Sequence, residues 1–302
     1  MHLFVTGGTG QTGPAIVSEL VAAGHHVTGL ARSDAATARL SALGATPWPG
    51  SLDDLDALAA GAAASDGVVH LAFGGADFSD PPALTRRDVA AIQALGEPLV
   101  GTGKPLIVTS GTLVLPAGRV GVETDPGRPD AVAGLRHGGE RACLDLAERG
   151  VRAVVVRLPP TVHGPRDHGF VPMLVATARR TGVSAYVGDG SNRWPAVHRL
   201  DAAVVYRLVL EQAPAGSTWH GVAETAIPFR SIAAKIGERL GVPVTSVEPG
   251  DAGDHFGNPF MATVFGADAP ASGTHTQRTL GWTPRHPTLL EDLEHGDYVP
   301  AA

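Results

Sequence analysis

Three glycines near the N-terminus have the spacing needed to bind a phosphate group. Gly7, Gly10 and Gly13 follow the apolar run Leu3 to Val5 and precede a helical segment that opens with Pro14. The first glycine can turn the chain off a strand, the second lets a pyrophosphate approach the backbone, and the third lets the helix pack closely. The N–H groups that begin the helix then face the phosphates. A tight turn without a ligand is the alternative, but this order of strand, turn and helix favours a dinucleotide site.

The residues after the second expected strand, 26–30, indicate which dinucleotide binds. An acidic side chain there holds the ribose 2′-hydroxyl of NAD, whereas arginine pairs with the 2′-phosphate of NADP. Here the strand leads into Arg32 and Ser33. We predict that Arg32, with Ser33 as a second donor, binds the 2′-phosphate, so NADP(H) is the preferred cofactor. Asp34 could serve a ribose hydroxyl, so NAD(H) is not excluded, and an exposed loop position is the alternative for Arg32.

Alternating strands and helices predict the fold that positions these residues. Helical patterns at 14–23, 35–43 and 135–149 separate apolar runs that we expect to be strands. The strands are expected at 3–5, 26–30, 46–49, 67–73, 105–110 and 151–158. This alternation is typical of an α/β protein with a doubly wound parallel sheet of the Rossmann type. The carboxyl ends of its strands, including the Gly74–Gly75 pair after the fourth, should border the cofactor crevice.

The length, net charge and cysteine content of the chain limit the classes of protein and of binding partner that fit it. The 302 residues are 43% hydrophobic, which suits a large α/β core with a small second domain. A net charge of −7 gives no general attraction to nucleic acid or to an anionic membrane. The single cysteine, Cys143, excludes an internal disulfide framework and fits a reducing compartment. With no signal-type segment, we expect a cytoplasmic protein with a small-molecule substrate; a homodimer is compatible with the sequence.

Five motifs together resemble the short-chain dehydrogenase/reductase superfamily, and more narrowly its extended and atypical NAD(P)-dependent epimerase/dehydratase branch. They are T-G-G-T-G-Q-T-G at 6–13, H-L-A at 70–72, T-S-G-T at 109–112, R-L-P-P-T-V-H-G-P at 157–165 and G-D-G-S-N-R-W-P-A-V-H-R-L-D-A-A at 188–203. The resemblance implies a NAD(P)-binding domain over 1–165 with a return segment at about 194–222. It implies a small substrate domain over 166–193 and 223–302.

The resemblance also assigns cofactor contacts. It implies that the glycine turn holds the pyrophosphate, Arg32 faces the adenosine ribose, and residues 51–52 lie at the adenine. Residues 71–72 would line the nicotinamide ribose, and 159–162 would close over the nicotinamide. The predicted cofactor-binding residues are Gly7, Thr9, Gly10, Gln11, Thr12, Gly13, Arg32, Ser33, Ser51, Leu52, Leu71, Ala72, Pro159, Pro160, Thr161 and Val162.

The catalytic residues depart from the family, which uses a serine or threonine with Tyr-x-x-x-Lys. Ser110 or Thr112 can supply the hydroxyl, but His137 and Arg141 occupy the tyrosine and lysine positions by their i, i+4 spacing. In one interpretation His137 donates the proton and Arg141 holds the cofactor ribose. In another, the role of the tyrosine has moved or vanished. A nearby arginine would lower the pKa of His137, which weakens the first interpretation, and a solvent-facing histidine is the third.

Two histidines after the sixth strand are candidate substrate contacts. His163 and His168 flank the start of the expected second domain. With Asp167 they could indicate a metal, but the sequence lacks the H-x-x-x-H spacing of a zinc enzyme, so we predict no metal.

An aromatic group further along the chain is the other candidate for the substrate pocket. Trp194 and His198 could form a wall, although similar segments often serve as a packing seam. Phe256 and Phe260 could cap the pocket or belong to the core of the small domain.

Together these features predict an NADP(H)-dependent oxidoreductase that transfers hydride to a small or medium carbonyl or imine. A protonated imine already carries the charge that a tyrosine would otherwise neutralise, so it would tolerate the missing tyrosine. One alternative is a sugar-nucleotide epimerase or dehydratase, or a non-redox lyase, on the same fold. Cationic side chains facing a diphosphate would favour the sugar nucleotide. Another alternative is a non-catalytic sensor of the NADP redox state.

Overall fold

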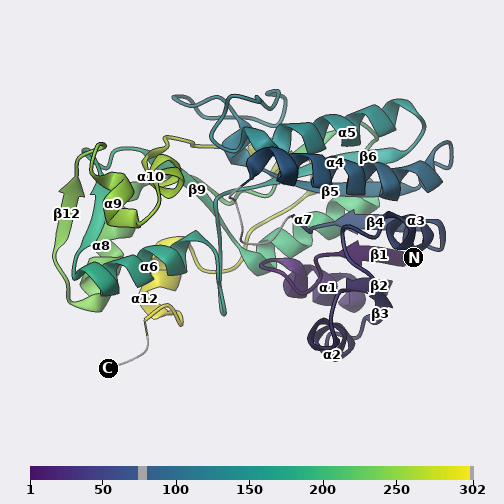
Figure 1. Ribbon diagram of the computed structural model, residues 1–302, viewed down its shortest axis with the longest axis horizontal. Coiled ribbons are helices and arrows are strands. Elements are labelled where there is room, and N and C mark those ends of the chain that lie inside the picture. The colour runs from purple at the N-terminus through teal and green to yellow at the C-terminus, as the bar shows by residue number, and fades with distance from the viewer. Residues whose placement is uncertain (74–79, 300–302) are drawn as a thin grey trace.

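A seven-stranded parallel sheet forms the larger part of the molecule (Figure 1). The computed structural model describes residues 1–73 and 80–299, so Gly74 and Gly75 lie outside the described residues. The strand order is β10-β6-β5-β4-β1-β2-β3. The strands are β1 (His2–Thr6), β2 (His26–Ala31), β3 (Thr46–Pro49), β4 (Gly67–His70), β5 (Pro105–Gly111), β6 (Arg152–Leu158) and β10 (Thr218–His220). This order confirms the predicted doubly wound Rossmann sheet.

Helices cover both faces of this sheet because its strands are apolar on both sides. In β1, the side chains of Leu3 and Val5 join one apolar cluster and Phe4 joins the other, and all three are fully buried. The helices on the Leu3 face are α1 (Gly13–Ala22), α2 (Asp34–Ala42) and α7 (Arg199–Gln212). Those on the Phe4 face are α3 (Leu55–Ala63), α4 (Pro81–Gly96) and α5 (His137–Glu148), of which α4 and α5 lie at the top of Figure 1.

Three short helical turns complete this part: η1 (Glu97–Leu99), η2 (Thr112–Val114) and η3 (Gly134–Arg136). The last one changes the predicted start of the helix at 135–149. Residues 134–136 form a tight 3₁₀ turn, and the regular helix α5 begins only at His137. Strand β4 is likewise shorter than predicted and ends at His70.

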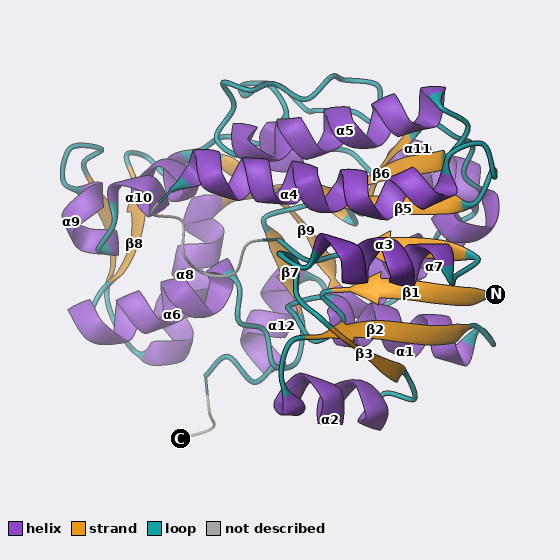
Figure 2. Cartoon of the chain, turned by 45° about the vertical axis from the view of Figure 1, so that its right-hand side comes forward, coloured by secondary structure: helices purple, strands orange, loops and turns teal. Residues whose placement is uncertain are grey.

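A second unit lies beside the carboxyl ends of the strands (Figure 2). It has its own buried core, in which the rings of Trp194, Phe229 and Phe265 pack together. Its elements are β7 (Thr161–His163), α6 (Phe170–Thr181), β8 (Ser184–Val187), β9 (Arg193–His198), β11 (Glu224–Pro228), α8 (Phe229–Leu240), β12 (Val244–Val247), α9 (Ala252–Phe256), α10 (Pro259–Gly266) and α12 (Leu289–His295). They include a three-stranded sheet, β11-β9-β7, and a two-stranded sheet, β12-β8.

The C-terminal region returns to the larger unit before the chain ends. Helix α11 (Thr274–Leu280) contacts α7 and β10, and both Leu280 and Trp282 belong to the apolar cluster beneath α1. These residues therefore differ from the predicted division, which placed all of 223–302 in the small domain.

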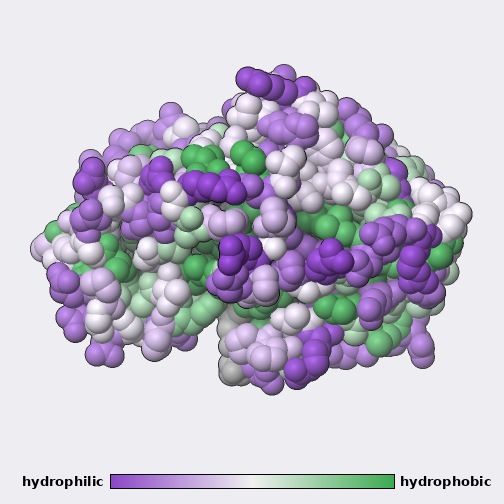
Figure 3. All heavy atoms as spheres, turned by 90° about the horizontal axis from the view of Figure 1, so that it is seen from above, coloured by the Kyte–Doolittle hydropathy of each residue, from purple (hydrophilic) through white to green (hydrophobic). Residues whose placement is uncertain are grey.

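The surface seen in Figure 3 has hydrophobic side chains in small groups among hydrophilic ones. Within residues 1–73 and 80–299, no helix combines the length and the apolar character needed to cross a bilayer.

Candidate cofactor and substrate site

In the glycine turn between β1 and α1, close backbone packing requires glycine at positions 7 and 13. Gly10 instead borders open space that a ligand could occupy. Gly7 has a φ of +70°, and a Cβ on it would lie 2.6 Å from the backbone nitrogen of Ala72. A Cβ on Gly13 would lie 2.2 Å from the Gly7 carbonyl oxygen. A Cβ on Gly10 would meet only that carbonyl oxygen, at 3.2 Å, so the space beside Gly10 is otherwise open. The cap residue of α1, Thr12, makes no side-chain hydrogen bond to the helix. An open cradle before an uncapped helix fits a pyrophosphate.

Gln11 links this turn to the loop after β7. Its Nε2 donates to the Val162 carbonyl oxygen at 3.1 Å and to the Asp167 carboxylate. Its Oε1 accepts from the backbone N–H of His168 at 3.0 Å. The side chain of Gln11 is therefore engaged by protein, and only its backbone is available to a cofactor.

The carboxyl ends of β2 and β3 carry the residues predicted for the adenosine side. Arg32 is exposed and has no hydrogen bond or ion pair with any residue that the structure describes. The Ser33 hydroxyl accepts from the Ala36 N–H and caps α2, so its own proton remains free to be donated. The Ser51 hydroxyl accepts from the backbone N–H of Asp53 at 3.2 Å.

A buried polar chain positions the strand end at Leu71 and Ala72. Hydrogen bonds join Thr6 Oγ1 to His70 Nδ1 at 2.7 Å and His70 Nε2 to the Asp88 carboxylate at 3.3 Å. The Thr6 hydroxyl also lies 3.4 Å from the Ala72 N–H, which donates to it. Thr6, His70 and Asp88 were not among the residues predicted from the sequence to have a role at the site. The H-L-A motif was the available signal for His70, whereas no local pattern marks Asp88.

At the end of β5 there are two buried hydroxyls, and a partly buried cation bonds to the neighbouring residue, Thr109. Ser110 Oγ and Thr112 Oγ1 have no hydrogen-bond partner among the described residues. The guanidinium of Arg136 donates to the Thr109 carbonyl oxygen at 3.2 Å and stacks 3.5 Å from the centre of the Phe73 ring. Burial lowers the pKa of Arg136, although the carboxylate of Asp88 opposes this effect. The group still stays cationic, as arginine does in proteins.

The two predicted residues of helix α5 have different surroundings. His137 is its first residue, and its Nδ1 is buried without a partner in the described chain. Arg141 is exposed and pairs with Asp145 on the same helix at 3.1 Å, so it is not brought to the end of β5. The cation that lies there is Arg136. Counting the i, i+4 spacing from His137 missed it because Arg136 precedes the regular helix.

A buried ion pair fixes the next turn of α5 to the sheet. Both carboxylate oxygens of Glu140 accept from the Arg157 guanidinium of β6, at 2.7 and 2.8 Å. Both side chains are almost fully buried. This pair orients the first turns of α5 over the ends of β5 and β6.

After β6, the predicted nicotinamide segment forms a tight connection into β7. Pro159 and Pro160 lead into Thr161, whose hydroxyl donates to the Pro195 carbonyl oxygen at 2.5 Å. Val162 is buried against the larger apolar cluster and offers its carbonyl oxygen to Gln11.

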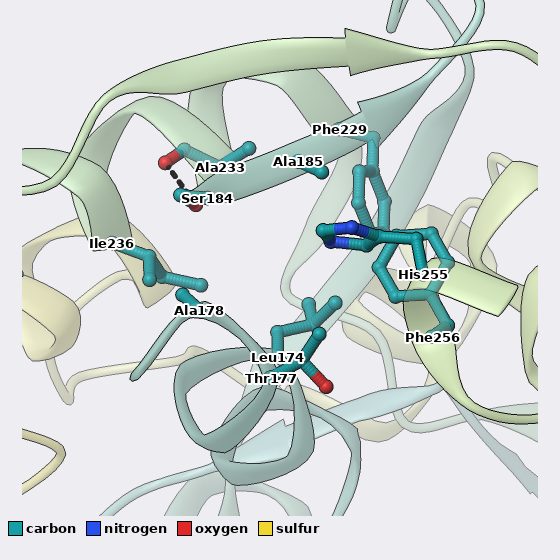
Figure 4. Close-up of a pocket in the computed structure, with 10 residues that line it drawn as sticks. All are labelled: Leu174, Thr177, Ala178, Ser184, Ala185, Phe229, Ala233, Ile236, His255 and Phe256. Carbon is teal, nitrogen blue, oxygen red and sulfur yellow. Dashed lines mark hydrogen bonds between the residues drawn. The ribbon is translucent and has the colours of Figure 1, made fainter. Parts of the chain in front are cut away.

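The structure corrects the predicted substrate role of Trp194. The ring is completely buried, and its Nε1 donates to the Ala267 carbonyl oxygen at 3.2 Å. Phe256 and Phe260 pack in or against the same core. Figure 4 shows a narrow cavity in this unit, with Phe229 and Phe256 on one side and Ser184 and Ala233 on the other. These aromatic residues form packing, the alternative that the sequence left open.

His163 and His198 belong to a buried seam between the two units, which also corrects their predicted role. His163 is fully buried, and its Nδ1 bonds to the Asp292 carboxylate of α12 at 2.9 Å. Its ring lies edge-on to His198, which in turn stacks on His286 at 4.8 Å. Burial and, to a smaller extent, His163 and His286 lower the pKa of His198 to about 4.

His168 is exposed, and its Nδ1 bonds to the Arg166 carbonyl oxygen. Within the described ranges, no three His, Cys, Asp or Glu side chains are arranged to hold a metal ion.

Comparison with known proteins assigns the family. Residues 3–220 match the NAD dependent epimerase/dehydratase family. The chain belongs to this family. This family is part of the short-chain dehydrogenase/reductase superfamily, which the sequence motifs predicted.

Members of the epimerase/dehydratase family and related proteins resemble the chain over most of its length. An uncharacterised protein of Schizosaccharomyces pombe, C2A9.02, is 48% identical over 99% of this chain and 100% of its own. A 2-alkyl-3-oxoalkanoate reductase of Stenotrophomonas maltophilia is 29% identical over 80% of this chain and 77% of its own. The crystal structure of DesIV, a dTDP-glucose 4,6-dehydratase of Streptomyces venezuelae with NAD bound, has a TM-score of 0.79 at 22% identity. It covers 97% of this chain and 96% of that one, and it shows the shared fold.

Proposed function

We propose that the chain is an NADP(H)-dependent reductase of a small or medium carbonyl compound. The observation that carries the proposal is the polar group at the end of β5. There the buried hydroxyls of Ser110 and Thr112 have no protein partner within the described chain, and the guanidinium of Arg136 lies beside Thr109. A buried hydroxyl without a partner is costly, so a ligand oxygen at this place would stabilise it.

The roles of the residues follow from this arrangement. The reduced nicotinamide supplies the hydride. Ser110 or Thr112 donates a hydrogen bond to the carbonyl oxygen, and Arg136 stabilises the negative charge that develops on it. His137, whose Nδ1 is buried without a partner in the described chain, supplies the proton.

Arg136 also favours a carbonyl over an imine as the substrate. A protonated imine is cationic, and a half-buried guanidinium close to it would repel it. A carbonyl oxygen gains negative charge during reduction and would be attracted. The related 2-alkyl-3-oxoalkanoate reductase supports a carbonyl substrate.

A carbonyl reductase is favoured over a sugar-nucleotide enzyme because an arginine of the second unit, Arg193, already forms an ion pair with Asp268. The guanidinium of Arg193 on β9 binds both carboxylate oxygens of Asp268, at 3.0 and 2.8 Å. That pairing neutralises a charge that would otherwise be available to a diphosphate. The NADP preference rests on Arg32, which is exposed and has no partner among residues 1–73 and 80–299. A cytoplasmic location remains part of the proposal and rests on the single cysteine.

The test is a titration with NADPH and NADH, followed by NADPH oxidation against aldehydes, ketones and cyclic imines. We expect tight NADPH binding and turnover of a ketone or aldehyde. Turnover of imines alone would contradict the role of Arg136, and binding without any turnover would favour the redox sensor. His137→Phe should slow turnover while leaving cofactor affinity nearly unchanged; full activity in this variant would show that the proton comes from elsewhere.

A further inference from the structure

Asp297 and Tyr298, which follow α12, form hydrogen bonds with the loop that follows β7. The Tyr298 hydroxyl donates to the Asp167 carboxylate at 2.7 Å and accepts from the Gly164 N–H at 3.2 Å. The Asp297 carboxylate accepts from the Arg166 N–H at 3.0 Å. Tyr298 is buried although it lies close to the end of the chain. Three hydrogen bonds therefore join this segment to three loop positions, 164, 166 and 167.

This loop needs outside support to keep its shape. Arg166 has a φ of 61°, in the left-handed region that side chains other than glycine rarely adopt. The bond from its N–H to Asp297 holds that conformation. At the start of the loop, the buried bond between His163 and Asp292 ties β7 to α12.

The same loop holds the glycine turn. The Asp167 carboxylate accepts from Gln11 Nε2, and the His168 N–H donates to Gln11 Oε1. Gln11 lies between Gly10 and Gly13, whose backbone borders the cradle. Tyr298 is thus connected to the glycine turn through two side chains, Asp167 and Gln11.

We propose that Tyr298 and Asp167 are positioning residues for dinucleotide binding. Tyr298 orients the Asp167 carboxylate, which fixes Gln11, and Gln11 fixes the backbone N–H groups of the turn in the direction of the pyrophosphate. The inference rests on the proposed binding of a dinucleotide at this turn. It adds that the affinity for the cofactor depends on a hydroxyl close to the other end of the chain.

The test compares two tyrosines by equilibrium binding of NADPH and NADH. Tyr298→Phe removes the hydroxyl and keeps the ring, so the dissociation constants of both nucleotides should rise about three- to tenfold. Tyr186→Phe is the matched control. Tyr186 lies on β8, and its hydroxyl has no hydrogen bond to any described residue, so the control should leave both constants within about twofold.

A double-mutant cycle separates positioning from general stability. Gln11→Met cuts the connection on the turn side, so adding Tyr298→Phe to it should produce no further loss of affinity. A purely structural role for Tyr298 would produce the same loss in both backgrounds, and that result would overturn the proposal. An unchanged affinity in Tyr298→Phe would overturn it as well.

Two further outcomes are informative. If Tyr298→Phe does not fold, Asp297→Asn weakens the same fastening at an exposed position and should show the same dependence on Gln11. If the unaltered chain binds neither nucleotide, the proposed function itself fails. Because binding is measured without turnover, that failure is distinct from a failure of the positioning role alone.

Discussion

A single guanidinium distinguishes the end of β5 from an ordinary strand end. Arg136 is half-buried and packs against Phe73, and it contacts a carbonyl oxygen rather than a carboxylate. Arg136→Met keeps most of the side-chain length but removes the charge, so we expect kcat for a carbonyl substrate to fall about 100-fold. Arg136→Lys should recover part of the loss. Steady-state kinetics at saturating cofactor measures both.

The matched control is the other arginine of this region. Arg141 is exposed and pairs with Asp145, so Arg141→Ala should retain the activity of the unaltered chain. A large loss in Arg141→Ala, with full activity in Arg136→Met, would restore the assignment made from the helical spacing.

Arg32 is the residue on which the choice between the two nucleotides depends. Its side chain is exposed and unpaired in the described structure, so a 2′-phosphate would gain a charge-assisted bond without breaking an existing one. Arg32→Ala should weaken NADPH binding about ten- to 100-fold and change NADH binding less than about twofold. Titration by fluorescence measures both constants. Equal losses for the two nucleotides would remove the 2′-phosphate assignment.

At the scale of elements, the attachment of α5 to β6 depends on a buried ion pair. Glu140→Gln leaves the Arg157 guanidinium buried without its full counter-charge, so the free energy of unfolding should fall by about 3–5 kcal/mol. Urea unfolding measures this change. Asp145→Asn breaks only the exposed pair with Arg141 on the same helix and should cost no more than about 1 kcal/mol. If both variants lost a similar free energy of unfolding, the buried Glu140–Arg157 pair would contribute no more to stability than the exposed Arg141–Asp145 pair.

The elements that sequence predicted well are those with local signals. The strand at 3–5, the glycine turn and the helix that opens with Pro14 follow from apolar runs and glycine spacing, which depend on neighbouring residues only. Trp194 carries no such signal. A tryptophan near strand residues suits a substrate wall or a core equally well, and only the packing of Phe229 and Phe265 around it decides between them.

The position of Arg136 could not be predicted for a related reason. Counting along a regular helix assumes that the helix begins where the pattern begins. Here Gly134 lies so close to Pro129 that a Cβ would be 2.0 Å from its carbonyl oxygen, and the chain enters α5 through a 3₁₀ turn. A periodic pattern of helical residues in the sequence does not reveal this loop contact between Pro129 and Gly134, so it could not show that Arg136 precedes the helix.

For the whole molecule, the seam between the two units makes stability depend on pH. Burial, together with His163 and His286, lowers the pKa of His198 from its ordinary value of 6.5 to about 4, while Asp292 and Asp201 oppose this. Between these two values the unfolded chain binds the proton more readily than the folded one. The contribution is complete above pH 6.5 and is lost as the pH falls towards 4. We expect the urea midpoint to decrease between pH 7 and pH 5.

A control variant isolates this histidine. His198 accepts a hydrogen bond from the Leu200 N–H at the start of α7, and asparagine can also cap a helix without titrating. In His198→Asn the urea midpoint should therefore change less between the two pH values. An unchanged pH dependence would assign the effect to other groups, such as the buried His220, whose pKa is also lowered by burial.

The return of the chain to its first unit has a consequence for biosynthesis. Strands β1 to β6 leave the ribosome early, but β10 completes the sheet edge only at residues 218–220. Trp282 and Leu280 complete the cluster beneath α1 later still. A nascent chain that stops before residue 280 therefore exposes the apolar surface that these side chains cover, and such surfaces promote aggregation. We expect the ribosome-bound chain to need a chaperone until residues 280–282 have left the ribosome.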